Sequence, residues 1–288
     1  MASSTLKSYY RLTKPGIVYG NSFAAIAGFF LASQNHFDAW LLIATLAGLG
    51  LVIGSACVFN NYIDRDIDAK MLRTKKRALA SSQIPVVSAL VFGSVLGIAG
   101  LAILAIWANL LTGIVALVGW LAYVGAYSYS KRRTVHGTLI GSISGATPPV
   151  IGYTAVSGQL DWQSLILFLI LVFWQMPHFY AIAIYRLRDY KAANIPVLPL
   201  VKGVSAAKKQ IMLYIAAFTL AALSLSLFGY AGYGYFLIML LAGLYWLSVG
   251  WRGFKTPDND HWAREMFGLS LIVLMIWVAA LSLDSLIG

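Results

Sequence analysis

The feature that most constrains this chain is a succession of apolar segments, each about as long as a helix that crosses a bilayer. A spanning helix needs about 20 mostly apolar residues, and nine segments approach that length. They are residues 17–33, 39–59, 86–107, 110–129, 137–156, 163–185, 210–228, 232–250 and 266–283. Only 11% of the 288 residues are charged, whereas a soluble domain carries about 25%. The sequence therefore predicts a polytopic membrane protein with nine transmembrane helices.

The positions of the basic residues predict how the chain crosses the membrane. All 21 Lys and Arg residues lie before the first segment or in every second connection after it, and the other connections hold none. Because basic residues stay in the cytoplasm, the N-terminus is predicted to be cytoplasmic and the C-terminus outside. The net charge of +11 is therefore gathered at one membrane face, which argues against a role in binding nucleic acid.

One polar stretch directly follows the second apolar segment. If that helix continues, Asn60, Asp64 and Asp68 fall at positions i, i+4 and i+8 and share one face, while Asp66 points away from them. Six basic residues are close in sequence: Arg65, Lys70, Arg73, Lys75, Lys76 and Arg77. Carboxylates that hold a divalent metal, next to cations that bind phosphate oxygens, suggest a diphosphate site at the membrane surface. The alternative is a solvated, charged loop.

A second long polar connection, residues 186–209, follows the sixth segment and contains Asp189 and Asn194. This connection and the first one, residues 64–83, are both predicted to be cytoplasmic. Each places acidic and basic residues and an Asn just past a spanning helix, which indicates a weak internal repeat. Repeats in membrane folds commonly place a site between the two halves, and long loops in compact bundles are often functional.

His178 lies inside the sixth apolar segment, close to Trp174 and Gln175. An ionisable residue within the membrane is a functional candidate by default. His178 could contact a substrate, hold the metal of a porphyrin or shuttle a proton, and the spacing alone does not choose among these roles. The alternative is a neutral imidazole that is satisfied by a neighbouring helix.

The fifth segment carries small residues and prolines. Gly137, Gly141 and Gly145 recur at intervals of four residues, a pattern that lets another helix approach closely. Pro148 and Pro149 are predicted to kink the helix and to free backbone carbonyls. Simple packing is the preferred interpretation of the glycines.

Several of these residues together resemble the membrane-embedded aromatic prenyltransferase superfamily, which includes 4-hydroxybenzoate polyprenyltransferase. The resemblance rests on Asn60-Asn61-x-x-Asp64-x-x-x-Asp68 with Arg73 and Arg77, on Tyr127-Ser128 with Lys131-Arg132, and on Asp189. Within the superfamily the chain is similar to the heme O synthases (protoheme IX farnesyltransferases) in residues 13–16, 58–68, 145–153, 174–178 and 194–199. Asn61 and the single Asp189 depart from the broad superfamily pattern, and both departures match this branch.

The resemblance implies a single all-α domain over residues 1–288, with nine helices around a central cavity that opens toward the cytoplasm. Farnesyl diphosphate would bind through Mg²⁺ held by Asn60, Asp64 and Asp68, with Asp189 as a further candidate. The cations expected on its phosphate oxygens are Arg73, Arg77, Lys131 and Arg132. A vinyl group of heme B, which is a substrate and not a cofactor, would accept the farnesyl group, and water would add to give heme O for terminal oxidases. The candidates for the porphyrin region are Trp174, His178 and Tyr153.

The same resemblance implies a multi-pass protein of a bacterial inner membrane, in contact with lipid, with its active site facing the cytoplasm. Its product would be handed to a heme A synthase or a terminal oxidase. One rival function is a prenyltransferase for an aromatic quinone precursor, which residues 174–178 and Asn61 argue against. The other is a transporter with His178 as its coupling site. Transporters concentrate polar groups near the midplane, whereas the acidic residues singled out here lie at the ends of helices.

Overall fold

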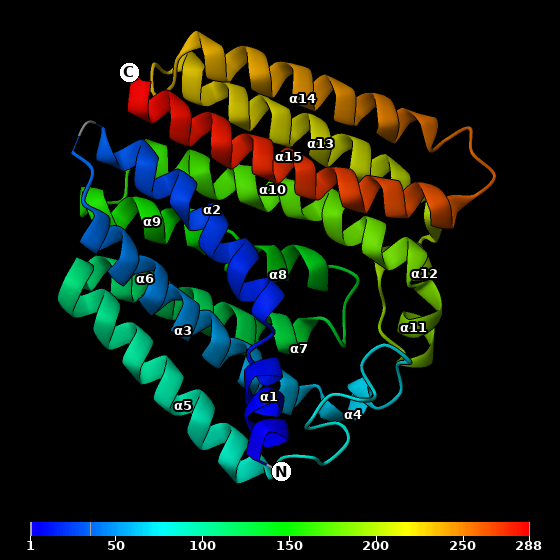
Figure 1. The fold of residues 1–288 in the computed structure, drawn as a ribbon. Helices are drawn as coiled ribbons and strands as arrows, with labels where there is room; N and C mark the ends of the chain where they lie inside the picture. Colours follow the sequence, from blue (N-terminus) through cyan, green and yellow to red (C-terminus); the bar gives the residue numbers. More distant parts are fainter. Residues whose placement is uncertain (1, 35, 288) are drawn as a thin grey trace.

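The computed structural model of the chain describes residues 2–34 and 36–287, and Figure 1 shows its course. Within these residues every regular element is helical. The elements are α1 (Ala2–Leu12), α2 (Pro15–Ser33), α3 (Ala39–Ile63), α4 (Arg65–Asp68), α5 (Val86–Ile103), η1 (Leu104–Ala108), α6 (Leu110–Leu121), η2 (Ala122–Tyr127), α7 (Ser128–Ser130), α8 (Gly137–Gly145), α9 (Thr147–Ser157), α10 (Trp162–Tyr185), α11 (Leu187–Ala192), α12 (Leu198–Val201), α13 (Gly203–Leu227), α14 (Tyr233–Arg252) and α15 (Asn259–Ile287). The predicted all-α fold is confirmed.

Eight helices of the described chain are long and apolar enough to cross a membrane, and they correspond to eight of the nine predicted segments. A helix suits this task because it satisfies its own backbone N–H and C=O groups where no water can do so. The outer face of α5 is apolar and open: Val91, Val95 and Ile98 are each more than half exposed. Such a face is stable against lipid and would be costly in water.

The fifth predicted segment differs, because it is divided into α8 and α9. α8 ends at Gly145 and α9 begins at Thr147, with Pro148 and Pro149 in its first turn. Proline has no N–H to donate, and the first turn of a helix is the place where none is needed. The predicted kink is therefore confirmed as a break. In the described residues this pair replaces a ninth long helix, since neither part alone has the length of a spanning helix.

Glycines let α9 approach α2 until the two backbones touch. A Cβ atom added at Gly28 of α2 would lie 1.9 Å from the carbonyl oxygen of Pro149, and one at Gly152 would lie 2.0 Å from that of Ala25. Small residues at a helix crossing allow this close approach in membranes. The contact holds the broken pair against the first long helix.

The largest hydrophobic cluster extends over α10, α13, α14 and α15, with contributions from α2. Its fully buried side chains include Phe218, Trp246 and Trp277. Aromatic side chains bury large apolar areas and fix neighbouring helices against one another. This cluster holds α10, which carries His178, in contact with α15.

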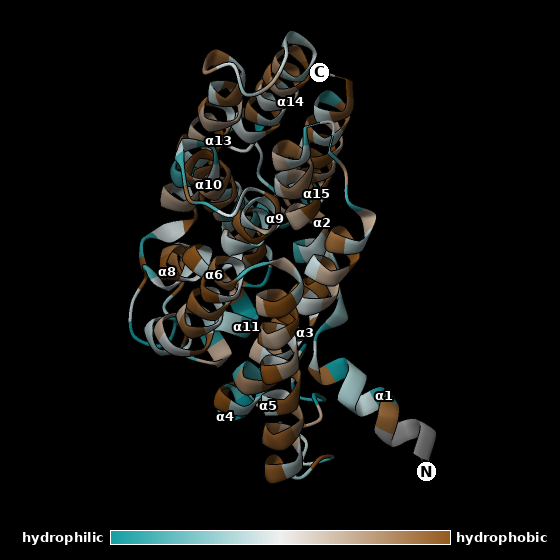
Figure 2. Ribbon diagram, turned by 90° about the vertical axis from the view of Figure 1, so that its left-hand side faces the viewer, coloured by the Kyte–Doolittle hydropathy of each residue, from teal (hydrophilic) through white to brown (hydrophobic). Residues whose placement is uncertain are grey.

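The two long polar connections meet at one end of the bundle, where α4, α11 and α12 lie (Figure 1). A small apolar cluster joins them, with Ile67 and Met71 from the first and Ile195 from the second. The backbone N–H of Leu72 also donates to Asp189 Oδ1 at 3.3 Å. Figure 2 shows hydrophilic residues on α4 and α11, whereas the long helices are mainly hydrophobic. The contact agrees with a site that lies between the two connections.

The α2–α9 crossing generates a prediction. Gly28→Ala places a Cβ against backbone that cannot move aside, and overpacking of this kind costs about 1–3 kcal/mol. We expect a lower unfolding temperature for the purified variant in detergent. Gly20→Ala on the same helix is the matched control, because an added Cβ there has no atom within 4 Å. Equal unfolding temperatures for the two variants would contradict the close crossing.

Candidate functional site

The polar stretch after the second long helix forms a buried cluster. The i→i+4 backbone hydrogen bonds continue across the end of α3, from Asp64 N to Asn60 O at 2.9 Å and from Asp68 N to Asp64 O at 2.8 Å. The side chains of Asn60, Asp64 and Asp68 therefore stay on one face, as predicted, and these residues are only 2–3% exposed. Burial rules out the alternative of a solvated loop. Asp66 points away, with a side chain that is 58% exposed.

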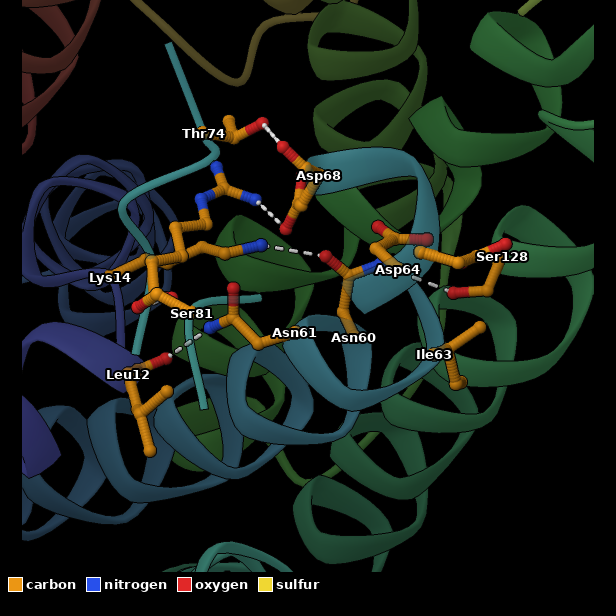
Figure 3. Close-up of polar contacts among 12 residues, drawn as sticks. Leu12, Lys14, Asn60, Asn61, Ile63, Asp64, Asp68, Thr74, Ser81 and Ser128 are labelled. Carbon is orange, nitrogen blue, oxygen red and sulfur yellow. Dashed lines mark hydrogen bonds and ion pairs between the residues drawn. The ribbon is translucent and has the colours of Figure 1, made fainter. Parts of the chain in front are cut away.

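Basic residues from three other segments converge on this cluster. Lys131 forms an ion pair with Asp64, Arg77 Nη1 lies 2.7 Å from Asp68 Oδ2, and Lys14 Nζ donates to Asn60 Oδ1 at 2.6 Å. Figure 3 shows Lys14, Asn60, Asp64, Asp68 and Ser128 gathered at this point. Charged groups are buried at tolerable cost only when partners of this kind are present.

Arg132 binds the outer side of the same turn. Its two terminal nitrogens donate to the two carboxylate oxygens of Asp66 at 2.9 and 2.7 Å, and it lies 3.6 Å from Asp64. Paired bonds between guanidinium and carboxylate are strong and fix the geometry. The hydrogen bond from Arg132 lowers the pKa of Asp66, so Asp66 stays ionised and anchors Arg132 beside the cluster.

The cluster carries more positive than negative charge. Two buried carboxylates, Asp64 and Asp68, and the outer Asp66 face the basic groups of Lys14, Arg77, Lys131 and Arg132. Burial lowers the pKa of Lys14 to about 8 and also lowers that of Lys131, because the local acids do not fully offset the loss of water. An additional anion would relieve this imbalance.

Two members of the site lie on η2, a π-helical segment. Tyr123 OH lies 3.4 Å from Asn60 Oδ1, and the Tyr123 and Tyr127 rings stack at 5.4 Å. Gly141 of α8 makes room for the second ring, since a Cβ there would lie 2.6 Å from it. π-helical turns inside helices are frequent at functional sites. The glycine pattern of the fifth segment thus contributes to the site through packing.

Sequence reasoning gave no role to three residues that the structure places here. Lys14 and Ser128 are named only as parts of family motifs, and Tyr123 carries no signal in the sequence. Ser128 accepts from Asn60 Nδ2 at 3.3 Å. Lys14 has a left-handed backbone (φ 50°, ψ 67°) directly before Pro15, which is uncommon for a residue with a side chain. The available signal for Lys14 is its place in the family motif of residues 13–16.

The remaining predicted residues of this region, Arg73 and Asp189, lie at its edge. Arg73 is exposed on the connection after α4, and it is close enough to Tyr190 to oppose the burial that raises the pKa of that hydroxyl to about 12. Asp189 accepts from Leu72 N.

The donor set suits Mg²⁺, although the protein alone does not complete a site. Asp64 Oδ1 and Asn61 Oδ1 are buried without a hydrogen-bond donor, and such orphaned oxygens indicate a missing partner. Mg²⁺ prefers oxygen ligands and in phosphate sites usually takes one or two carboxylates, with substrate oxygens and water as the rest. In the part of the chain that the structure describes, no three His, Cys, Asp or Glu side chains group closely enough to hold an ion.

A hollow of about 300 Å³ lies beside the cluster. Its lining includes Ile63 at the end of α3, Ser128, and Arg132 with Arg133. Ser128 and Arg132 line this hollow and also contact Asn60 and Asp64 of the cluster. The hollow therefore borders the outer side of the cluster.

The structure brings together two of the three residues predicted for a porphyrin. Trp174 and His178 stack at 4.9 Å on α10 and both bond to Ser270 of α15, through Trp174 Nε1 to the backbone oxygen and His178 Nδ1 to Oγ, each at 2.8 Å. The hydroxyl of Tyr153 instead bonds to Asp161 and Gln163. Asp161 is 17 residues before His178, about 25 Å along a helix. The Tyr153 hydroxyl is therefore remote from the other two residues.

Comparisons with known proteins agree on the family and the fold. The UbiA prenyltransferase family matches residues 21–280. The chain is 51% identical over 280 residues to protoheme IX farnesyltransferase of Yersinia pseudotuberculosis, covering 97% of this chain and 95% of that protein. It is 50% identical over 282 residues to protoheme IX farnesyltransferase 2 of Pseudomonas putida, covering 98% and 96%.

Solved structures share the architecture at lower identity. A digeranylgeranylglyceryl phosphate synthase superposes with a TM-score of 0.81 at 18% identity, over 99% of this chain and 100% of that one. A UbiA homolog from Archaeoglobus fulgidus bound to GPP and Mg²⁺ superposes with a TM-score of 0.67 at 16% identity, over 96% and 99%. At these identities the likeness concerns the fold.

The ion pair between Lys131 and Asp64 generates a prediction for stability. Lys131→Met removes the ion pair of the buried Asp64 carboxylate with Lys131 and leaves the longer contact with Arg132 at 3.6 Å. Breaking a buried pair costs about 3 kcal/mol or more. We expect a clear fall in the unfolding temperature, and Asp64→Asn in the same chain should recover most of it. Lys75→Met, at an exposed position, is the control. A fall that the second substitution does not reduce would contradict the pairing.

Proposed function

This chain belongs to the UbiA prenyltransferase family, and we propose that it transfers the farnesyl group of farnesyl diphosphate to a vinyl group of heme B, with addition of water, to give heme O. The observation that carries the proposal is the buried acid–base cluster around Asn60, Asp64 and Asp68, with its surplus of positive charge. The cluster lies in a chain that is half identical, over almost its whole length, to proteins named protoheme IX farnesyltransferase.

The membrane arrangement follows from the helices and the basic residues. The α8–α9 pair makes a ninth crossing, because basic residues 131–133 precede it whereas residues 158–161 after it include none. On this basis the N-terminus and the cluster face the cytoplasm. The chain resides in a bacterial inner membrane, and heme O passes from it to a heme A synthase or a terminal oxidase.

The buried cluster is the diphosphate site. Asn60, Asp64 and Asp68 supply oxygens for Mg²⁺, and Asp189 is a further candidate ligand. Bound Mg²⁺ would withdraw charge from the leaving diphosphate as a Lewis acid, which agrees with the relative that binds GPP and Mg²⁺. The basic groups for the phosphate oxygens are Lys14, Arg73, Arg77, Lys131 and Arg132.

The reaction needs stabilisation of negative charge when the C–O bond breaks, and exclusion of water while the new C–C bond forms. The allylic C–O bond breaks and both of its electrons leave with the diphosphate, whose new charge is met by the fixed cations. The π electrons of a heme vinyl group then form a bond to the farnesyl carbon. Water adds to the resulting cation and loses a proton, which leaves the hydroxyethylfarnesyl group. Apolar helices around the reacting carbons exclude other water until that step.

The heme region lies on α10. Trp174 and His178 are supported as its residues because they stack and share Ser270 as a partner. Tyr153 is less well supported than the sequence suggested, since its hydroxyl is bound at the other end of the bundle.

The identity of the farnesylated product distinguishes this function from the two rival functions. Membranes that contain the chain, incubated with radiolabelled farnesyl diphosphate, Mg²⁺ and heme B, should form labelled heme O, and membranes without the chain should form none. A parallel incubation replaces heme B with 4-hydroxybenzoate. Label in the benzoate product alone would overturn the proposal, and a transporter would give label in neither.

The acidic residues of the cluster should differ in their importance. Asp64→Asn or Asp68→Asn removes a charge that would hold the ion, so kcat should fall by about 100-fold or more, as it should when EDTA removes the metal. Asp66→Asn, on the outer side of the turn, should retain activity within a few-fold. Steady-state rates measured at saturating Mg²⁺ test this order. Near-normal rates in either of the first two variants would count against the metal assignment.

A further inference from the structure

Two arginines converge on one aromatic ring at the polar end of α10. The guanidinium carbon of Arg186, directly after α10, lies 5.2 Å from the centre of the Tyr185 ring, and that of Arg264 on α15 lies 4.9 Å from it. Among the described residues, neither guanidinium has a carboxylate within ion-pair distance, whereas nearby Arg252 is paired with Glu265. Both guanidinium carbons thus lie within 5.2 Å of one ring centre, and each guanidinium can bind a carboxylate through paired hydrogen bonds.

An aromatic face leads from this pair into the bundle. The Tyr185 ring contacts Phe267 at 5.9 Å, Phe267 contacts His178 at 4.8 Å, and His178 stacks on Trp174 at 4.9 Å. Tyr185, His178 and Phe267 are each half-buried, so these rings are not fully covered by the protein. A flat aromatic ligand fits such a face by offset or edge contacts.

The hydrogen bonds of Ser270 assign the proton of His178. Ser270 Oγ donates to the backbone oxygen of Phe267 at 2.6 Å, so it must accept from His178 Nδ1, 2.8 Å away. His178 Nε2 then carries the lone pair, and no hydrogen bond from the described residues reaches it. An imidazole that is fixed through one nitrogen and free at the other is the usual arrangement of a metal-ligating histidine.

We propose that Arg186 and Arg264 bind the two propionate carboxylates of heme B, with the porphyrin along Tyr185 and Phe267 and its iron toward His178 Nε2. This inference rests on the proposed function and adds the binding mode of the acceptor. His178 and Tyr185 are seven residues apart, about 10 Å along α10, a distance that suits a porphyrin centre and its propionate arms. Because the vinyl groups lie on the edge opposite the propionates, this orientation directs the reactive edge into the bundle.

The pairing also explains how the acceptor would be selected. A benzoate-type acceptor has one carboxylate and a single ring, so it can use one arginine and cannot reach from the pair to His178. Heme B uses both charges and the full aromatic face. Selectivity of this kind depends on leaving charges unpaired when the wrong ligand binds.

Steady-state kinetics with purified protein test the two arginines. The double variant Arg186→Ala/Arg264→Ala should raise the KM for heme B at least tenfold and leave the KM for farnesyl diphosphate unchanged. Arg188→Ala is the matched control, because it removes an exposed arginine of α11 two residues away. The Arg→Lys double variant should recover part of the loss. Equal changes in both KM values, or a normal KM for heme B, would overturn the proposal.

Changing the ligand separates propionate recognition from a general effect of charge. Wild-type protein should bind heme B dimethyl ester, which lacks both negative charges, about as weakly as the double variant binds heme B. The double variant should bind the ester with the same affinity as it binds heme B. An ester that binds to the wild type as tightly as heme B would overturn the assignment.

A direct titration keeps this inference distinct from the proposed function. Heme B is titrated into protein in a zwitterionic detergent, and the Soret band and the quenching of tryptophan fluorescence report binding, with His178→Ala expected to shift the Soret band. If wild-type protein makes no heme O, the proposed function fails, and the titration still decides whether this face binds a porphyrin. If it makes heme O while the double variant binds heme B normally and loses only affinity for phosphatidylglycerol, the arginines bind lipid headgroups and this inference alone fails.

Discussion

The rest of the structure depends on the burial of two carboxylates where α3 leaves the apolar part of the bundle. Asp64 and Asp68 are nearly inaccessible, and burying a carboxylate is costly unless cations pair with it. Lys131 and Arg77 supply those cations directly, and Lys14 and Arg132 bind the same turn. The ends of three other chain segments are thereby fixed to α3. The same pairs that hold the fold together also concentrate the positive charge that a diphosphate requires.

Irregular helices give this end of the bundle its shape. The break between α8 and α9 lets α9 lie against α2 through Gly28 and Gly152, while α8 runs beside η2. The π-helical turn of η2 then presents Tyr123 and Tyr127 to the cluster. Straight helices of uniform pitch would not place these groups together, since a residue added to one turn changes the face on which the following side chains lie. The helix break and the π-helical turn therefore determine both how the helices pack and where the side chains of the site lie.

The two substrates of the proposed reaction use different parts of the bundle. The proposed diphosphate site is built on α3 and α7 and on the connection after α4, whereas the proposed porphyrin face is built on α10 and α15. The link between them is the contact of the two long connections, through the apolar cluster around Ile67 and Ile195 and the bond from Leu72 to Asp189. Asp189 thus links one connection to the other through its bond from Leu72 N.

The sequence by itself determined the local features: eight of the nine predicted long helices and the kink in the fifth segment, the shared face of Asn60, Asp64 and Asp68, and the outward direction of Asp66. Each depends on residues within a few turns, and the lengths and periods of helices are visible in sequence. Only the tertiary structure decided which residues from distant parts of the chain form hydrogen bonds and ion pairs with one another. Lys14 and Lys131 reach Asn60 and Asp64 from 46 and 67 residues away, Asp189 reaches Leu72 across 117, and Tyr153 is turned away from His178. Such contacts follow from how helices pack, and in a membrane that packing depends on the fit of small and aromatic side chains, which no single segment reveals.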